Sequence, residues 1–364
     1  MLKFIDKIVC LISILAIICL LGAYTSAYID PNMFVWPSLL GLAYPYLLLV
    51  NLILLFYWLI RWRGMFWAVL VILIAGVPTF MTYYGTANKQ TKAPAPDLTV
   101  LSYNIRYFDV YAWTKQKDTK EKLLNYLNDF KGDVICLQEF TTSGPAQSQQ
   151  ELVRRLHTYP YHHIYKDIAI FSRFPLIHRG QLAFTSGQSG SCIYCDLLCH
   201  KDTVRLYSVH LESYKLGKKE RQFVQDIGQG LKREELSDGV KNLFSRITRA
   251  NRNRALQADL IKTHLNQSPH KVVLCGDFND TPLSYTYEKI KKGLSDSFIE
   301  KGRGLGNTYI GEFPSFRIDY ILHSPEITTV GYTRPDLRLS DHYPVKAALK
   351  LKNKPSPPGH GKKT

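Results

Sequence analysis

Short polar clusters interrupt the chain at the ends of successive apolar runs between residues 97 and 352. They supply carboxylate, amide and imidazole groups from Asn104, Glu139, His210, Asp277, Asn279, Asp319, Asp341 and His342. Apolar runs such as 134–137 and 272–275 predict buried strands of a sheet. A polar group buried at a strand end loses hydration, which is costly unless the group is paired or binds a metal ion. Because six strand ends share this feature, we expect one polar pocket at one edge of a layered fold.

This set of groups suits metal-assisted hydrolysis. Carboxylate and amide oxygens are the ligands that hard cations prefer, so the set favours Mg²⁺ or Mn²⁺ over zinc. The sequence has neither a serine-centred elbow nor a Walker-type glycine loop, which favours an attacking water over a covalent enzyme nucleophile. A metal ion and cationic imidazoles would stabilise the charge that develops on phosphate oxygens. The pocket therefore predicts hydrolysis of a phosphate ester.

From about residue 99 to residue 351 the chain resembles the endonuclease/exonuclease/phosphatase superfamily, whose members include deoxyribonuclease I-like enzymes and neutral sphingomyelinases. The motifs that carry the resemblance are QE at 138–139, GDFN at 276–279 and SDH at 340–342. The resemblance implies an α/β fold, a four-layer sandwich of two packed, mostly antiparallel sheets flanked by helices. It implies a divalent-metal-dependent phosphodiesterase, first of all an endonuclease-like hydrolase acting on nucleic acid. A sphingomyelinase-like phospholipid head-group hydrolase is the alternative.

The resemblance also implies roles for the metal and water groups. Glu139 would be the principal metal ligand, with Asn104 and Asp341 close to the metal and the scissile phosphate. Asp277 would orient or deprotonate the attacking water, and Asn279 would hold that water and a phosphate oxygen. All of these residues are present, so an enzyme is favoured over a membrane-bound binding protein that has lost its activity.

The remaining roles fall on two histidines and an arginine. His342 would contact the phosphate, with Asp319 fixing its tautomer and favouring its cationic form. His210 would help to protonate the leaving oxygen, although the sequence leaves open which histidine is the acid. Arg106 stands where abasic-site enzymes tend to carry an acidic residue. Since arginine cannot ligate a cation, we expect Arg106 to hold a non-scissile phosphate instead, and a second metal is not indicated.

Three of these residues also have purely structural interpretations. Asn104 could be a turn residue, Asp319 could be an ion-pair partner of Arg317, and His210 could be a hydrogen-bonded core histidine. Only coordinates distinguish these alternatives from the functional ones.

The chain before about Tyr84 is almost continuously apolar. Three stretches, 9–24, 39–60 and 65–84, are each near the roughly 20 residues that a helix needs to cross a ~30 Å hydrocarbon core. We therefore predict a membrane domain at 1–87 with three transmembrane helices, a linker at 88–96, the catalytic domain at 97–352 and a disordered basic tail at 353–364. The lipid bilayer is then a partner, and no protein partner is indicated.

The placement of basic residues predicts the orientation. Lys3 and Lys7 precede the first stretch, Arg61 and Arg63 lie between the second and third, and residues 24–60 contain no lysine or arginine. By the positive-inside rule these basic ends are cytoplasmic, so the catalytic domain would face the periplasm or exterior of the inner cell membrane. A cleaved signal sequence at the first stretch is the alternative, and it leaves the large domain on the same side.

Two further features have open interpretations. Cys192, Cys195 and Cys199 could indicate zinc, but their strand-like alternation would place the thiols on both faces, and a disulfide among them is permitted without a readable pairing. The formal net charge is +16, and residues 215–254 are rich in lysine and arginine. That stretch is either a solvated helix face or a basic surface for nucleic acid or an anionic membrane.

Overall fold

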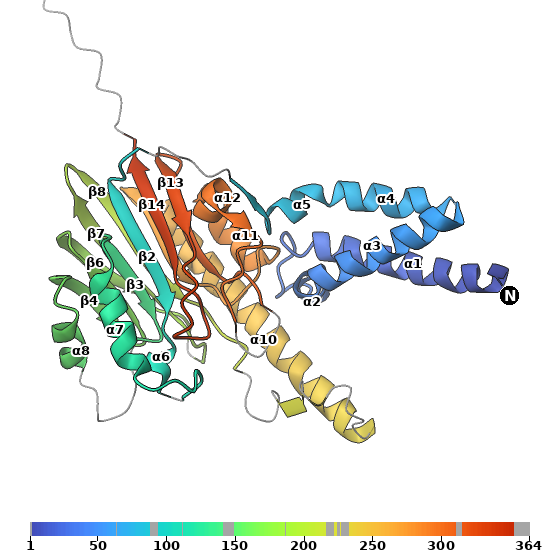
Figure 1. Ribbon diagram of the computed structural model, residues 1–364, viewed down its shortest axis with the longest axis horizontal. Helices are drawn as coiled ribbons and strands as arrows, with labels where there is room; N and C mark the ends of the chain where they lie inside the picture. The colour runs from blue at the N-terminus through green and yellow to red at the C-terminus, as the bar shows by residue number, and fades with distance from the viewer. Residues whose placement is uncertain are drawn as a thin grey trace, which may run out of the picture.

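The computed structural model describes residues 2–62, 64–87, 94–110, 112–140, 149–185, 187–215, 222–223, 226, 233–310 and 315–352. Two sheets pack face to face with helices on their outer sides, and a group of apolar helices extends from one end of this sandwich (Figure 1). Most of the predicted linker, residues 88–93, and the predicted tail at 353–364 lie outside the described residues.

Each sheet has six strands and one parallel pair near its centre. The first has the order β13 (Ile327–Thr333), β14 (Val345–Leu351), β2 (Leu98–Asn104), β3 (Val134–Gln138), β5 (Ile168–Ser172) and β4 (Tyr161–Tyr165). The second has the order β10 (Ser295–Asp296), β12 (Asp319–His323), β9 (Lys271–Asp277), β8 (Asp202–His210), β7 (Ser191–Cys199) and β6 (Leu176–Leu182). The parallel pairs are β2 with β3 and β8 with β9, and the other pairings are antiparallel. The expected α/β sandwich of two mixed sheets is confirmed.

Alternate residues of the central strands fill the space between the sheets. Val100, Cys136, Leu206 and Val273 belong to this core and are fully buried. The opposite faces of the strands pack against helices: α7 (Thr119–Asp129) and α8 (Gln149–Arg155) cover the first sheet, and α10 (Arg233–Asn266) and α11 (Tyr285–Lys291) cover the second. Because strand residues alternate between faces, Cys192 and Cys195 lie in different cores. This separation places apart two of the three thiols that a zinc site would bring together, and no disulfide links any of the seven cysteines, all of which the structure describes.

The amino-terminal segment has two helices that are long and apolar enough to cross a membrane, within α1 (Leu2–Tyr24) and α3 (Tyr44–Arg61). The prediction of three such helices is wrong for the third stretch. It is divided at Gly76 into α4 (Met65–Ala75) and α5 (Val77–Met81), which are 11 and 5 residues long. One cause is visible: Pro78 has no N–H to continue a helix. Gly76, at the break, packs on the Tyr24 ring, where a Cβ would clash.

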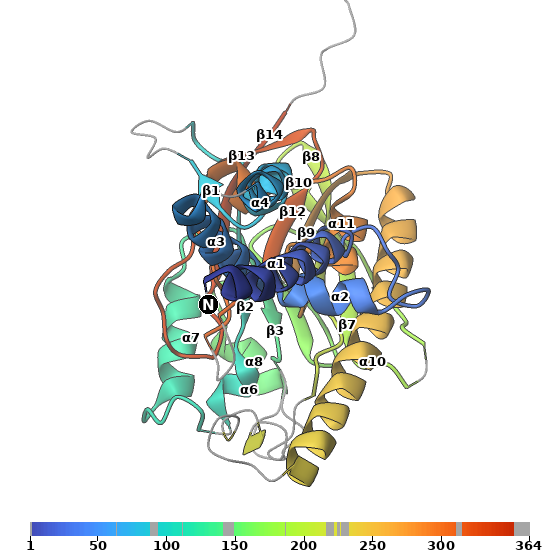
Figure 2. The ribbon, with the colours of Figure 1, turned by 90° about the vertical axis from the view of Figure 1, so that its right-hand side faces the viewer.

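The apolar helices pack directly on the sandwich. β1 (Gly85–Thr86) pairs with β11 (Arg303–Gly304), and the Ser26 hydroxyl donates to the carbonyl of Leu283. Leu283 also belongs to an apolar cluster with Leu20 and Tyr44 from α1 and α3. The α2 helix (Trp36–Leu42) lies against α10, as Figure 2 shows. The amino-terminal helices and the sandwich are therefore connected by direct packing as well as by the linker.

A buried ion pair lies at this junction. Arg317 and Asp296 are almost fully buried and their Nη1 and Oδ2 atoms are 2.6 Å apart. Arg317 Nη2 donates to the carbonyl of Thr82 at 2.8 Å, just after α5. The guanidinium also lies over the Phe298 and Tyr320 rings, 4.5 and 4.7 Å from their centroids. A buried charge loses its hydration, and these contacts compensate for that loss.

We expect Asp296→Ala to lower the free energy of unfolding of the full chain in detergent by about 3–5 kcal/mol, because it leaves the Arg317 charge buried and unpaired. The matched control is Glu121→Ala, which removes the partner of Arg155 in an exposed ion pair and should cost about 1 kcal/mol or less. Guanidinium unfolding followed by near-ultraviolet circular dichroism measures both. Equal losses for the two variants would contradict the assignment.

Candidate active site

The four central strands bring polar residues together at one edge of the sandwich. Asn104 and His210 are the last residues of β2 and β8, Asp277 is the last residue of β9, and Glu139 directly follows β3. In the two parallel pairs, Asn104 is in register with Gln138 and His210 with Asp277. Parallel strands end at the same edge of a sheet, and the two sheets face each other. The side chains from both sheets therefore meet in one pocket.

Asn104 connects two of the acidic residues of this pocket, Glu139 and Asp277. Its Nδ2 donates to Glu139 Oε1 at 3.3 Å and to Asp277 Oδ2 at 3.0 Å. Glu139 has a left-handed backbone, with φ of +51°, which turns the chain at the end of β3. Burial raises the pKa of Glu139, and the negative charge of Asp341 raises it further. A buried carboxylate cluster of this kind is unfavourable by itself, and its oxygen donors suit a hard divalent cation.

Asp319 holds one histidine in the pocket. Asp319 Oδ2 lies 2.9 Å from His342 Nδ1, and the other ring nitrogen, Nε2, lies 3.8 Å from Asp277 Oδ2. Burial alone would lower the pKa of His342, but the negative charges of Asp319 and Asp277 raise it to about 10. Ligand atoms of these three residues lie within 4.8 Å of one another. Since His342 is already hydrogen-bonded to Asp319, we interpret this group as a charged histidine between two carboxylates rather than as the metal centre.

Asp167 holds the second histidine, and no sequence motif predicted this aspartate. Its Oδ2 lies 2.7 Å from His210 Nδ1, and its Oδ1 accepts a hydrogen bond from Ser191 at 2.7 Å. His210 Nε2 is buried, has no hydrogen-bond partner among the residues that the structure describes, and lies 3.7 Å from Glu139 Oε1. Burial would lower the pKa of His210, but Asp167, Glu139 and Asp277 raise it to about 9. Asp167 lies in the turn between β4 and β5, where a polar residue is ordinary.

Arg106 and Asp341 form an ion pair at the rim of the pocket. Arg106 Nη1 lies 2.8 Å from Asp341 Oδ2, and the guanidinium lies 5.2 Å from the Trp113 ring centroid. Arg106 begins α6 (Arg106–Asp109), a turn whose four residues all have positive φ. Its backbone N–H donates to Asn104 Oδ1 at 3.0 Å. Arg106, which was predicted to hold a phosphate, is thus paired with Asp341, which was predicted to lie near the metal.

The contacts of Asp319 and His210 decide against their purely structural interpretations. Asp319 pairs with His342, whereas Arg317 pairs with Asp296, so the proposed Asp319–Arg317 ion pair is not formed. His210 is paired with a carboxylate and faces Glu139, unlike a histidine of an apolar core. All eight clustered residues and Arg106 lie in or beside one pocket, and their individual roles remain predictions.

A buried arginine supports the loops of the site from α10. Arg254 is fully buried, and it donates to Asp280 Oδ2 at 3.1 Å, to the carbonyl of Glu212 at 2.8 Å and to Asn251 Oδ1 at 2.6 Å. Asp280 directly follows Asn279, whose Nδ2 donates to the carbonyl of Leu211 at 3.0 Å. Arg254 had been counted within the basic stretch as part of a surface. It instead ties α10 to the loops that follow β8 and β9.

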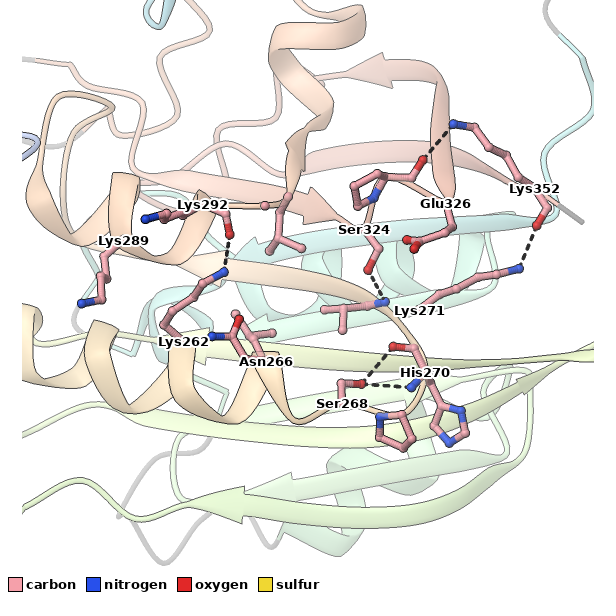
Figure 3. Close-up of a pocket in the computed structure, with 16 residues that line it drawn as sticks. Lys262, Asn266, Ser268, His270, Lys271, Lys289, Lys292, Ser324, Glu326 and Lys352 are labelled. Atoms are coloured by element: carbon pink, nitrogen blue, oxygen red, sulfur yellow. Dashed lines mark hydrogen bonds between the residues drawn. The ribbon is translucent and has the colours of Figure 1, made fainter. Parts of the chain in front are cut away.

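A separate groove of about 1150 Å³ lies at the other end of β9 (Figure 3). Its walls include five lysines: Lys262, Lys271, Lys289, Lys292 and Lys352. Lys271 is paired with Asp202 at 3.2 Å and Lys289 with Asp259 at 2.5 Å. Since β9 has seven residues, this groove is about 20 Å from the carboxylate cluster. It is not part of the candidate active site.

Comparison with known proteins identifies the family. The model of the Endonuclease/Exonuclease/phosphatase family matches residues 101–342. The chain therefore belongs to this family. A second model, of a domain of unknown function, matches residues 6–83. No curated protein matches the sequence.

Solved structures share the fold at low sequence identity. The human Nocturnin catalytic domain with bound sulfate is 17% identical, with a TM-score of 0.52, and the match covers 72% of this chain and 97% of that one. D. rerio TDP2 complexed with single-strand DNA product is 18% identical, with a TM-score of 0.51 and coverages of 70% and 99%. A family protein from Bacteroides thetaiotaomicron is 17% identical, with a TM-score of 0.50 and coverages of 71% and 98%.

We expect Asp167→Asn to move the alkaline limb of the pH–rate profile. His210 is cationic below its pKa of about 9, so a step that needs its proton fails as the pH rises through that value. Without the Asp167 charge, burial dominates, and the limb should shift to lower pH by about 1–3 units. Asp202→Asn, at the far end of β8, is the control. A lower rate with an unmoved limb would show that Asp167 acts only through packing.

Proposed function

We propose that the chain is a divalent-metal-dependent phosphodiesterase that cleaves its substrate by direct attack of water. The observation that carries this proposal is the pocket in which Asn104 joins Glu139 to Asp277. Two histidines, each held by its own aspartate, face the same pocket. Membership of the family supports a phosphoester hydrolase and a divalent cation in general, and the residues of this pocket support the particular assignment.

Glu139 would hold Mg²⁺ or Mn²⁺, with Asn104 and Asp341 beside it. When bound, the cation supplies positive charge to the scissile phosphate and neutralises the buried carboxylates. Asp277 would accept the proton of the attacking water, because its Oδ1 and Oδ2 are already oriented by Asn279 N and Asn104 Nδ2. Burial raises the pKa of Asp277, which makes this carboxylate a better proton acceptor when it is ionised.

The two histidines would have different roles, one in phosphate binding and one in proton donation. His342 is cationic at neutral pH, because its pKa is about 10, and its charge would bind a phosphate oxygen. His210 carries a proton on Nε2 when cationic, and this buried nitrogen has no partner in the described residues. It is therefore the better candidate for donating a proton to the leaving oxygen.

Nucleic acid is the first candidate substrate. A hollow of about 280 Å³ is lined by Trp113, Ile310, Arg338 and Tyr343, and Tyr343 directly follows His342. Aromatic and arginine side chains beside a phosphate site suit an unpaired nucleobase. A structural neighbour, D. rerio TDP2, was solved with a single-strand DNA product, which supports the same substrate class.

A phospholipid head group is the second candidate, and the amino-terminal helices favour it. We propose that α1 and α3 cross the cell membrane, and that α4 and α5, broken at Gly76 and packed beside α3, carry the chain back through the same layer to the sandwich. Arg61 Nη2 lies 2.8 Å from Asp6 Oδ2, so the amino terminus of α1 and the end of α3 share one side. The basic residues on this side favour the cytoplasm, which leaves the catalytic domain outside.

We expect Asp277→Ala to lower the hydrolysis of bis-p-nitrophenyl phosphate by the full chain at least about 100-fold, because the proton acceptor is lost. EDTA should abolish the wild-type rate, and added Mg²⁺ should restore it. Asp259→Ala, which removes the α10 partner of Lys289 in α11, is the control and should keep its activity. Metal-independent turnover, or turnover insensitive to Asp277→Ala, would refute the mechanism, and a binding protein would show no turnover at all.

The substrate classes separate in a parallel assay on plasmid DNA and on sphingomyelin liposomes. A nuclease should nick the plasmid, and Trp113→Ala should lower that rate roughly tenfold through lost stacking of about 1–3 kcal/mol. Hydrolysis confined to the liposomes would instead support the head-group candidate.

A further inference from the structure

The α10 helix is longer than its packing on the second sheet requires. Its carboxyl-terminal half places Ala255, Ala258 and Ile261 in the core beneath it, where all three are fully buried. Its amino-terminal half extends beyond the sandwich, on the side from which α1, α3 and α4 project (Figure 1). The projecting half therefore needs a role other than covering the sheet.

An apolar stripe runs along this projecting half. Leu236, Val240 and Phe244 follow one another at a spacing of four residues, and 43%, 52% and 38% of their surfaces are exposed. Leu243 and Ile247 belong to the same stripe and are half-buried. A contiguous apolar strip on a projecting helix indicates that it contacts another apolar phase.

The stripe is continuous with the outer ends of the amino-terminal helices. The Phe244 ring lies 5.3 Å from the ring of Trp36, the first residue of α2. Met33 and Phe34, in the segment between α1 and α2, are also exposed. Asn251 Nδ2 donates to Ser38 Oγ at 2.8 Å, which fixes α10 against α2. Tryptophan in this position is typical of a membrane–water interface.

The other side of the projecting half is charged. Lys241, Arg249 and Arg252 are exposed there, and acidic residues such as Glu234 and Asp238 lie mainly in the first turns. A helix with an apolar stripe and a charged opposite face that includes basic residues is suited to lie in the headgroup layer of a bilayer. Basic side chains beside that layer favour anionic lipids.

We propose that residues 233–249 of α10 lie in the outer headgroup layer of an anionic bilayer, next to the ends of α1 and α3. The inference rests on the membrane attachment that we proposed above. Arg254, one turn further along the same helix, bonds to the loops of the catalytic pocket. The bilayer contact therefore orients the active site towards the membrane surface, where phosphodiesters of either origin would be met.

Depth-dependent quenching tests this placement with the full chain in nanodiscs of phosphatidylcholine and phosphatidylglycerol. Val240→Cys and Asn242→Cys are labelled with a nitrobenzoxadiazole probe, and wild type treated in the same way gives the background from native cysteines. Val240 lies on the stripe and Asn242 on the charged side. Nitroxide-labelled lipid should quench the probe at 240 at least roughly twofold more strongly than the probe at 242.

A third label separates the two proposals. Ile53→Cys lies on the exposed side of α3 and should be strongly quenched if that helix spans the bilayer. Quenching at 53 without quenching at 240 would overturn the α10 proposal and leave the membrane attachment intact. The absence of quenching at both positions would overturn the attachment, and activity on a soluble phosphodiester would remain a separate measurement.

Two further measurements test the proposed preference of α10 for anionic lipid, one with a protein variant and one with a different lipid. Arg249→Glu should reduce the quenching of the Val240→Cys probe in the anionic nanodiscs, because it replaces attraction to the lipid headgroups with repulsion. Nanodiscs of phosphatidylcholine alone should reduce it in the same direction. Unchanged quenching in both cases would show that the contact is apolar only and would contradict the anionic part of the proposal.

Discussion

Buried negative charge is the constraint on which the candidate site depends. Four carboxylates, those of Glu139, Asp277, Asp319 and Asp341, lie within one pocket whose walls exclude most water. Left alone, such a set would repel itself and take up protons. The fold balances it with two histidines, whose pKa values are raised to about 9 and about 10. The two histidines leave part of the negative charge of the carboxylates unbalanced. A bound divalent cation would balance it.

The sandwich makes this balance geometrically possible. One parallel pair in each sheet aligns two strand ends, and packing the sheets face to face brings the two sets together. A wholly antiparallel sheet would send neighbouring strand ends to opposite edges. The pocket residues are thus fixed by rigid strands and by turns with unusual backbones, such as Glu139 and Asn279 with positive φ.

The sequence predicted the members of the pocket that directly follow apolar strands, because the local pattern carries the signal. Asp167 was missed, since an acidic residue in a hairpin turn is usually solvated and nothing local distinguishes it. Arg254 lies in the basic stretch that was interpreted as either a solvated helix face or a basic surface, because composition cannot tell which residues of a long helix face inward. The break at Gly76 was missed because hydropathy averages over a window, whereas Pro78 removes a helix N–H at a single residue.

The same buried arginines that stabilise the sandwich also connect it to the amino-terminal helices. Arg317 bonds Asp296 within the domain and the carbonyl of Thr82 outside it. Arg254 joins α10 to Asp280, and three residues later Leu283 packs among apolar residues of α1 and α3. The loop that follows Asp277 and Asn279 is therefore held by α10 on one side and by α1 and α3 on the other. Displacing the helices would remove contacts from the loop that orients the proposed water-activating residue, so the amino-terminal segment is part of the structure that supports the site.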